Sequence, residues 1–224
     1  MFNMENPVWR FIGKLIDVFV VNMLFILCAL PVVTFVPSCS AMYYVTLKLV
    51  RDEENYPARS FFRFFKKNWK QGILLSIITL GTGIIFIADI ALYRAYASDI
   101  TGSAFLTVLM VALLFVWIMV MMYVCPVFAR FDNSTKNILK NALLMSIAHL
   151  PKTILMILIT VVLGVLGIFV PILWFGLIAF ANSYILVKIF DRYMPKDTEE
   201  KLTPEERVNR NEPISTFMGE NPEK

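Results

Sequence analysis

The stretch PVVTFVPSCSAMYYVTLKLVRDEENYPARSFFRFFKKNWKQG, residues 31–72, decides how the chain is organised. It begins with apolar sequence that two prolines interrupt, continues as a short amphipathic run at 38–50, and then turns at a compact polar segment. It closes with FFRFFKKNWK at 61–70, which is both aromatic and basic. Seven Lys or Arg and three acidic residues lie between Lys48 and Lys70, and long apolar segments flank the stretch. This pattern predicts a cytoplasmic loop at a membrane surface.

The composition indicates a membrane protein with several spans. Hydrophobic residues make up 58% of the chain and the mean hydropathy is +0.68, whereas soluble domains contain about 45–50% apolar residues. The chain carries 15 basic and 8 acidic residues before Asp191, and 6 basic and 9 acidic residues from Asp191 onward. We therefore expect a helical transmembrane domain at 1–190 and a charged, mostly disordered cytoplasmic tail at 191–224.

Apolar runs of membrane length recur and predict an all-α bundle of about six membrane helices, one of them short. The predicted spans lie at about 11–30, 38–50, 71–93, 103–127, 153–170 and 171–190. Pro31 and Pro37 are expected to bracket a non-helical corner before the second span, and Pro126 to end the fourth. The second span has only 13 residues, so a re-entrant or surface helix remains the alternative, with five spans and an external N-terminus. DNST at 132–135 offers caps for a further helix across 136–149.

The distribution of basic residues predicts that both termini are cytoplasmic. Six spans place every strongly basic segment on the inner side: 10–14, 48–70, 130–152 and 188–192. They place the weakly charged connections outside: 31–37, 97–102 and 167–171. Those external connections then carry a single charged residue, Asp99.

Residues 58–70 are expected to form a helix in the membrane interface that leads into the span that follows. They combine aromatic rings with cations: Phe61, Phe62, Phe64, Phe65 and Trp69, and Arg59, Arg63, Lys66, Lys67 and Lys70. Two interpretations remain open, a helix on the lipid surface and a docking surface for a partner protein. Because a purely electrostatic contact does not need five large rings, we expect the rings to insert into the interface or into a groove on a partner.

Small residues recur at helical spacing in the span that follows the aromatic and basic segment. Gly72, Ser76, Thr79 and Gly83 predict a close approach of this span to a neighbouring helix.

Polar side chains within the predicted spans are candidates for an intramembrane role: Asp17, Asn22, Asp89 and Asn182. Asp17 follows Lys14 by one turn, so an ion pair at the interface explains it as well as a role in transport does. Asp89 precedes Arg94 by five residues and has the same two interpretations. Asn182 is expected to form a hydrogen bond to another helix.

The chain contains no phosphate-binding glycine-rich loop and no metalloprotease or nucleophile-elbow motif. His149 has no second histidine to complete a metal site or a relay, and the three cysteines form no metal-ligand pattern. We therefore expect no enzyme activity, no cofactor and no metal. The basic excess is confined to loops that flank spans, which argues against nucleic acid as a partner.

Motifs in a fixed order resemble the YesL-like family, which is named as domain of unknown function 624. The matching positions are Leu30–Thr34, Pro37, Ala41–Tyr44, Leu47–Lys48, Phe61–Phe62, Phe64–Lys66 and Asn68–Gln71. NALLMSIAHLPKT at 141–153 and AFANSYIL at 179–186 are similar to the family as well, so the likeness extends over 1–192. Val36 stands where the family has glycine, so a less tightly bent corner is expected here.

The resemblance implies a small integral protein of the bacterial cell membrane in Gram-positive bacteria. Genes of this family tend to stand beside genes for carbohydrate ABC importers and glycan-degrading enzymes. The resemblance therefore implies an accessory protein that assembles, stabilises or gates the permease of such an importer, with the lipid bilayer and the permease subunits as partners. The alternative is a small-solute transporter or channel that the four intramembrane polar residues line.

Overall fold

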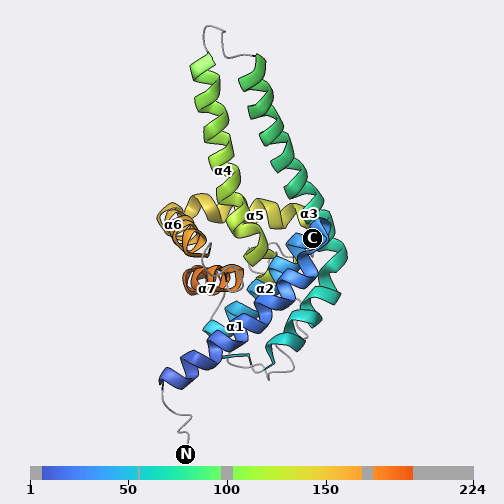
Figure 1. The fold of residues 1–224 in the computed structure, drawn as a ribbon, viewed down its shortest axis with the longest axis vertical. Coiled ribbons are helices and arrows are strands. Elements are labelled where there is room, and N and C mark those ends of the chain that lie inside the picture. Colours follow the sequence, from blue (N-terminus) through green and yellow to red (C-terminus); the bar gives the residue numbers. More distant parts are fainter. Residues whose placement is uncertain (1–6, 55, 97–102, 168–173, 194–224) are drawn as a thin grey trace, which may run out of the picture.

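The computed structural model describes residues 7–54, 56–96, 103–167 and 174–193, and within these ranges the chain forms helices and short connections without strands. The helices, shown in Figure 1, are α1 (Pro7–Ala29), η1 (Val32–Thr34), α2 (Phe35–Val50), α3 (Pro57–Tyr96), α4 (Ser103–Arg130), α5 (Thr135–Ala148), α6 (Leu150–Gly167) and α7 (Trp174–Tyr193). Five helical segments are long and apolar enough to cross a membrane, or up to six if the bent pair α5–α6 is one span. The predicted all-α membrane bundle is confirmed.

Two prolines predicted at helix breaks lie inside helices instead. Pro37 is the third residue of α2, where its missing N–H has no cost because N–H groups of the first turn have no acceptor within the helix. Pro126 lies in the last turns of α4, which continues to Arg130. The corner before α2 is therefore at 30–34, where the Thr34 hydroxyl lies 2.6 Å from the Cys28 carbonyl oxygen.

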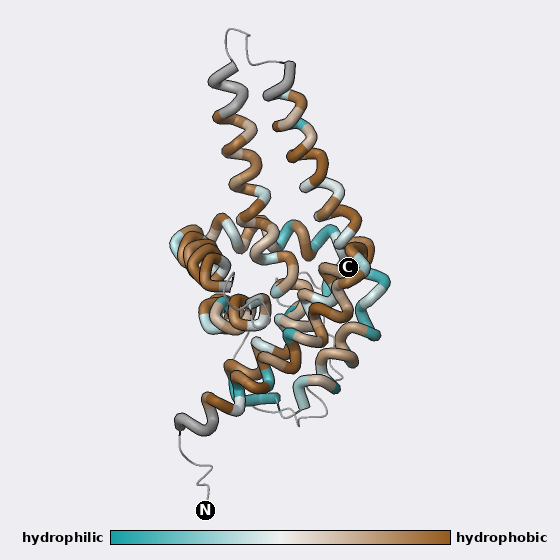
Figure 2. Tube along the Cα trace, in the orientation of Figure 1, coloured by the Kyte–Doolittle hydropathy of each residue, from teal (hydrophilic) through white to brown (hydrophobic). Residues whose placement is uncertain are grey.

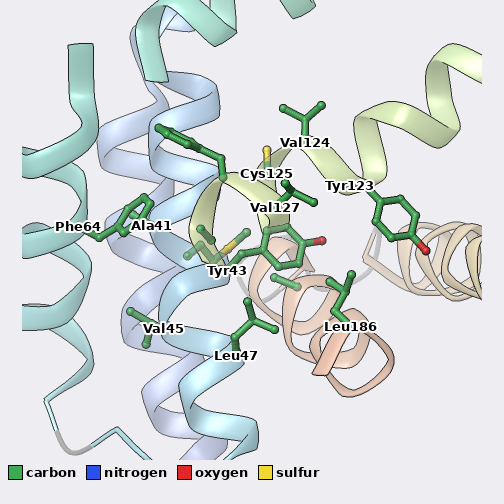
Figure 3. Packing of buried hydrophobic residues seen from close by; sticks show 14 of the residues in the cluster. Ala41, Tyr43, Val45, Leu47, Phe64, Tyr123, Val124, Cys125, Val127 and Leu186 are labelled. Atoms are coloured by element: carbon green, nitrogen blue, oxygen red, sulfur yellow. The ribbon is translucent and has the colours of Figure 1, made fainter. Parts of the chain in front are cut away.

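α2 lies at the centre of the fold and packs against α1, α3, α4 and α7. Eleven of its 16 residues are buried. Figure 3 shows Ala41, Val45 and Leu47 of α2 between Phe64 of α3 and Leu186 of α7. Its extensive burial makes α2 the helix against which the others pack.

α3 is a single helix of 40 residues, about 60 Å long at 1.5 Å per residue. The segments predicted as an interfacial helix at 58–70 and as a span at 71–93 are therefore two parts of one continuous helix. Between the two segments the sequence has no proline or turn, and Gly72 alone lowers helix stability by only about 1 kcal/mol relative to alanine. The first half of α3 runs along α2, and the second half continues beyond it (Figure 1).

The second half of α3 and the first half of α4 form a hairpin that extends beyond the other helices (Figure 1). Most of the hairpin is brown in Figure 2, which marks apolar residues on both helices. Its large exposed apolar side chains include Ile77, Ile84, Ile85, Ile87, Val108, Leu109, Val111, Leu113 and Phe115. A surface of this kind suits lipid tails or another membrane helix rather than water.

The row of small residues on α3 faces neighbouring elements closely, as predicted. A Cβ on Gly72 would lie 2.5 Å from Cβ of Pro37 in α2, and one on Gly83 would lie 2.9 Å from the Trp117 ring of α4. The Trp117 indole N–H donates a 3.0 Å hydrogen bond to the hydroxyl of Thr82. These contacts hold α3 against α2 below and against α4 above.

The last three helices form the other side of the bundle. α5, predicted across 136–149, is confirmed at Thr135–Ala148, and it meets α6 at an angle of 97°. α6 and α7 pack against each other, and α7 also packs on α1 and α2. Figure 1 shows α6 and α7 nearly end-on while α3 and α4 run along the page, so the α6–α7 pair crosses the α3–α4 pair steeply.

The contact between Pro37 and Gly72 affects the predicted topology. The sequence predicts the corner at 31–37 outside the cell and the basic segment ending at Lys70 inside. Gly72 follows Lys70 by two residues and lies against Pro37, whereas a hydrocarbon layer is about 30 Å thick. The two placements therefore cannot both hold, and the corner lies at the depth where α3 changes from basic to apolar.

Several predictions concern residues outside the described ranges. They are the external connection at 97–102, most of the connection at 167–171 and the disordered tail beyond residue 193. The first residues assigned to the tail, 191–193, belong to α7.

Candidate functional site

Ion pairs gather around the end of α2 and the neighbouring first half of α3, a region that we refer to as the ion-paired side. They are Lys14–Asp52 (2.9 Å), Lys48–Glu54 (3.9 Å), Arg51–Asp191 and Lys67–Asp132 (3.4 Å). Three of them join the first half of α1 and the end of α7 to the end of α2 and the turn before α3, and the fourth joins Lys67 within α3 to the connection before α5. Such pairs contribute only about 0–1 kcal/mol each where they are exposed, so their main information is positional. Parts of all four segments predicted to share one side of the membrane lie together.

A small pocket opens on this ion-paired side, where α2, α4 and α7 end. Its charged lining residues are Lys48, Arg51, Glu53 and Arg130. The Lys48 ammonium lies 4.4 Å from the centre of the Tyr44 ring, a cation–π distance, and Arg51 is paired with Asp191. Because protein groups already engage these two cations, we assign the pocket to the ion-paired surface rather than to a ligand site.

The aromatic side chains of the 58–70 segment divide between the core and the surface. Phe61 is fully buried, and the Phe64 ring stacks on Tyr44 of α2 with centroids 4.9 Å apart. Phe64 also meets Phe128 of α4 edge to face at 5.8 Å. The expectation that these two rings insert into lipid or into a partner is therefore wrong, because they anchor α3 to α2 and α4. Phe65 is half-buried and stacks with Phe61.

The remaining rings and all the cations of this segment are exposed. Phe62 is 41% exposed and Trp69 is 46% exposed. The exposed cations are Arg59, Arg63, Lys66, Lys67 and Lys70. The surface available to lipid or to a partner thus keeps the predicted charge but has only two exposed rings, Phe62 and Trp69.

The two candidate asparagines form contacts between helices. Asn22 is fully buried on α1, and its side-chain oxygen accepts a 2.8 Å hydrogen bond from the Gly176 N–H of α7. The Asn182 side-chain amide donates a 3.1 Å hydrogen bond to the Thr160 hydroxyl of α6, as predicted for an interhelical contact. Both residues therefore position α7.

The two candidate aspartates lie far apart in the fold. Asp17 is partly buried on the first half of α1, near the ion-paired side. Asp89 is exposed on the protruding half of α3. The four candidate polar residues therefore face different neighbours, and their role as a transport lining stays a prediction.

Sequence reasoning missed the side chains of one helix that accept hydrogen bonds from backbone N–H groups at the N-terminus of another helix. The Ser76 hydroxyl of α3 accepts a 3.1 Å hydrogen bond from the Val36 N–H in the first turn of α2. Asn22 does the same for Gly176 in the first turn of α7. N–H groups of a first turn have no acceptor within their helix, and no water replaces it inside a bilayer. The signal was present in the small polar residues that interrupt apolar runs.

A further buried contact joins α2 to α7. The hydroxyls of Thr46 and Ser183 are hydrogen-bonded at 2.9 Å, and both residues are fully buried. Ser38 and Ser40 are buried on the same helix. α2 thus combines an apolar core with small hydroxyl groups, which allow helices to approach closely.

The comparison with protein families matches residues 18–90 to a family described as "Protein of unknown function, DUF624". The matched region contains about half of α1, all of α2 and most of α3, including the contacts of Pro37 with Gly72 and of Tyr44 with Phe64. Residues 18–90 of this chain are similar to the DUF624 family. The resemblance to YesL-like proteins is thereby confirmed.

Two curated relatives from Bacillus subtilis (strain 168) are similar to this chain. One, described as "Uncharacterized protein YesL", is 28% identical over 134 residues, which cover 59% of this chain and 62% of the relative. The other, "Uncharacterized protein YteU", is 29% identical over 152 residues, which cover 66% of this chain and 65% of the relative. The chain thus matches less than two thirds of the length of either relative. No solved structure matches.

Proposed function

We propose that this protein is an accessory membrane subunit of a carbohydrate ABC import system, which assembles, stabilises or gates the permease. Two arguments support the proposal. The family resemblance implies a role beside such importers, and the α3–α4 hairpin offers a membrane-embedded surface suited to another protein.

The hairpin is the observation that carries the proposal. It extends beyond the other helices and exposes large aliphatic side chains on both α3 and α4 (Figure 2). Its two helices are held in register by the hydrogen bond of Trp117 to Thr82 and by the close approach of Trp117 to Gly83. A preorganised pair of helices loses little conformational freedom when a partner helix packs against it.

We also propose that both termini lie in the cytoplasm of a bacterial cell. The ion pairs support this orientation, because they bring the first half of α1 and the end of α7 to the same side as the basic segments. Basic segments of membrane proteins prefer the cytoplasmic side.

Site-specific photo-crosslinking in intact membranes of the source bacterium tests the partner. A benzoylphenylalanine residue is placed in the hairpin at Ile84 or Val108, and control positions of similar exposure are Leu158 and Val161 of α6. We expect the hairpin positions to crosslink to permease subunits, identified by mass spectrometry, and the α6 positions to give little or none.

Affinity purification in mild detergent provides the second measurement. Co-purification of permease subunits with the tagged wild-type chain is expected. Recovery of the chain alone, together with no permease crosslink from either helix, would contradict the proposal. Permease crosslinks from α6 alone would support the permease as partner but would exclude the hairpin as the surface that contacts it.

A further inference from the structure

One face of α3 is cationic in the first half of the helix and aliphatic in the second half. At steps of three, four or seven residues, this face carries Arg59, Arg63, Lys66 and Lys70, followed by Leu74, Ile77 and Ile84, all exposed. Residues at these spacings lie one above another on a helix. Phe62 and Trp69 flank the cations and are also exposed. We refer to Arg59, Phe62, Arg63, Lys66, Trp69 and Lys70 as the basic lane.

The cations of the basic lane point away from the protein. Lys67, which lies beside the lane, is paired with Asp132. Arg59, Arg63, Lys66 and Lys70 have no ion-pair partner among the residues that the structure describes. An anion that pairs with these four cations therefore has to come from outside the described residues.

The change from cations to aliphatic residues along α3 marks the depth at which the helix enters the hydrocarbon layer. Trp69 is 46% exposed and lies just over one turn before Leu74, which is 49% exposed. Tryptophan is enriched where hydrocarbon meets the headgroup layer, and lysine close to that boundary extends toward the headgroups. Because α3 is one continuous helix, the boundary of the hydrocarbon lies between Lys70 and Leu74.

We propose that the basic lane binds the headgroups of anionic phospholipids at the membrane surface. Lys66, Trp69 and Lys70 lie within the headgroup layer, which is about 5–7 Å thick on each side of a bilayer. Lys66 and Arg59 are seven residues apart, which corresponds to about 10 Å along the helix. That separation exceeds the screening length of about 8 Å at physiological salt. The contribution of each cation therefore falls from Lys70 toward Arg59.

This gradient separates a lipid surface from a docking surface for an acidic protein. A protein partner reaches Arg59 and Arg63 as readily as Lys66 and Lys70, since it is not confined to one depth. A lipid layer reaches only the end of the lane next to the aliphatic residues. The position of the lane directly below the apolar half of α3 favours lipid.

Equilibrium binding of short-chain lipids to the full-length protein in neutral detergent micelles tests the proposal. The probes are dioctanoyl phosphatidylglycerol, dioctanoyl phosphatidylcholine and inorganic phosphate. The variants are K66Q/K70Q, R59Q/R63Q and, as a matched control, K136Q/K140Q, which removes two exposed cations from α5. All six side chains are exposed, so gel filtration and thermal unfolding should be unchanged in each variant.

We expect K66Q/K70Q to weaken phosphatidylglycerol binding roughly 25-fold, since each cation at an anionic surface contributes about fivefold. R59Q/R63Q should weaken it less than about threefold, and the α5 control should leave it unchanged. Phosphatidylcholine should bind more weakly and equally to all variants. Added salt should reduce the difference between the wild type and K66Q/K70Q.

Other outcomes overturn the proposal. Equal losses in all three double variants would indicate diffuse charge, and unchanged affinity in K66Q/K70Q would remove the lane from lipid binding. Competition by inorganic phosphate at the concentration at which the lipid binds would indicate a site for small anions. If K66Q/K70Q bound lipid with normal affinity but no longer co-purified with permease subunits, the lane would be a protein-docking surface.

Discussion

The side-chain oxygen of Asn22 in α1 accepts a hydrogen bond from the backbone N–H of Gly176 in α7 at 2.8 Å. Gly176 is the third residue of α7, so its N–H has no acceptor within its own helix. A Cβ on Gly176 would lie 2.9 Å from Cβ of Asn22 and 3.0 Å from the Val18 carbonyl oxygen. The missing side chain of Gly176 therefore lets α7 approach α1 closely enough for Asn22 to cap it.

Replacing Asn22 with alanine should lower the free energy of unfolding by about 1–2 kcal/mol, because the buried Gly176 N–H loses its acceptor. The measurement is thermal unfolding of the purified protein in one detergent. N137A, at an exposed position on α5, serves as the control and should change stability by less than about 0.5 kcal/mol. Equal melting temperatures for N22A and N137A would show that the Asn22 contact does not hold α7.

Replacing Gly72 with alanine should destabilise the protein by about 1–3 kcal/mol, because the new Cβ would lie 2.5 Å from Cβ of Pro37. Gly81, further along α3, has nothing within 4 Å of the position that a Cβ would occupy. G81A should therefore be neutral or stabilise the helix by up to about 1 kcal/mol. Thermal unfolding of the two variants checks the contact between α2 and α3. A G72A protein as stable as G81A would contradict it.

Replacing Phe61 with alanine should destabilise the protein by about 3–5 kcal/mol, because the ring is fully buried among apolar residues. F62A should cost less than about 1 kcal/mol, since that ring is 41% exposed. The amount of folded protein in the membrane, measured by detergent extraction and gel filtration, should fall for F61A and remain near the wild-type amount for F62A. The reverse order would place Phe62 rather than Phe61 in the core.

The division of the aromatic residues shows where sequence reasoning reaches its limit. The spacing of Gly72, Ser76, Thr79 and Gly83 is enough to predict a packing face. Continuing the same spacing toward the N-terminus reaches Phe65 and Phe61, so the burial of Phe61 is predictable once α3 is taken as one helix, whereas Phe64 lies to the side of this row. The strong basic charge of 59–70 instead suggests an interfacial helix, because charge indicates depth but not continuity of the backbone.

The central position of α2 is harder to predict. Its 16 residues are few for a span, and its Ser and Thr residues resemble those of a loop. Only the three-dimensional packing shows that the same hydroxyls face other helices, with Thr46 bonded to Ser183 of α7. The same limit applies to the ion pairs, because the sequence predicts that basic segments share a side but not which acids meet them.

The corner before α2 provides the last prediction. Val33 is 49% exposed, so a cysteine there is accessible to a labelling reagent wherever the corner meets water. The contact of Pro37 with Gly72 places the corner beside Lys70, at the membrane boundary inferred from the basic lane. In a background with Cys28, Cys39 and Cys125 replaced by alanine, V33C should therefore resist a membrane-impermeant maleimide applied to intact cells.

Two further single-cysteine variants calibrate that experiment. D99C, in a predicted external connection, should be labelled from outside, and E5C, near the predicted cytoplasmic N-terminus, should be labelled only after the cells are opened. Labelling of E5C from outside would overturn the cytoplasmic N-terminus. Labelling of V33C from outside, as efficient as that of D99C, would place the corner on the outer surface. The basic half of α3, which lies against α2, would then have to cross the bilayer at about 2.5–3.5 kcal/mol for each buried cation, and the lipid-headgroup assignment of the basic lane would fail.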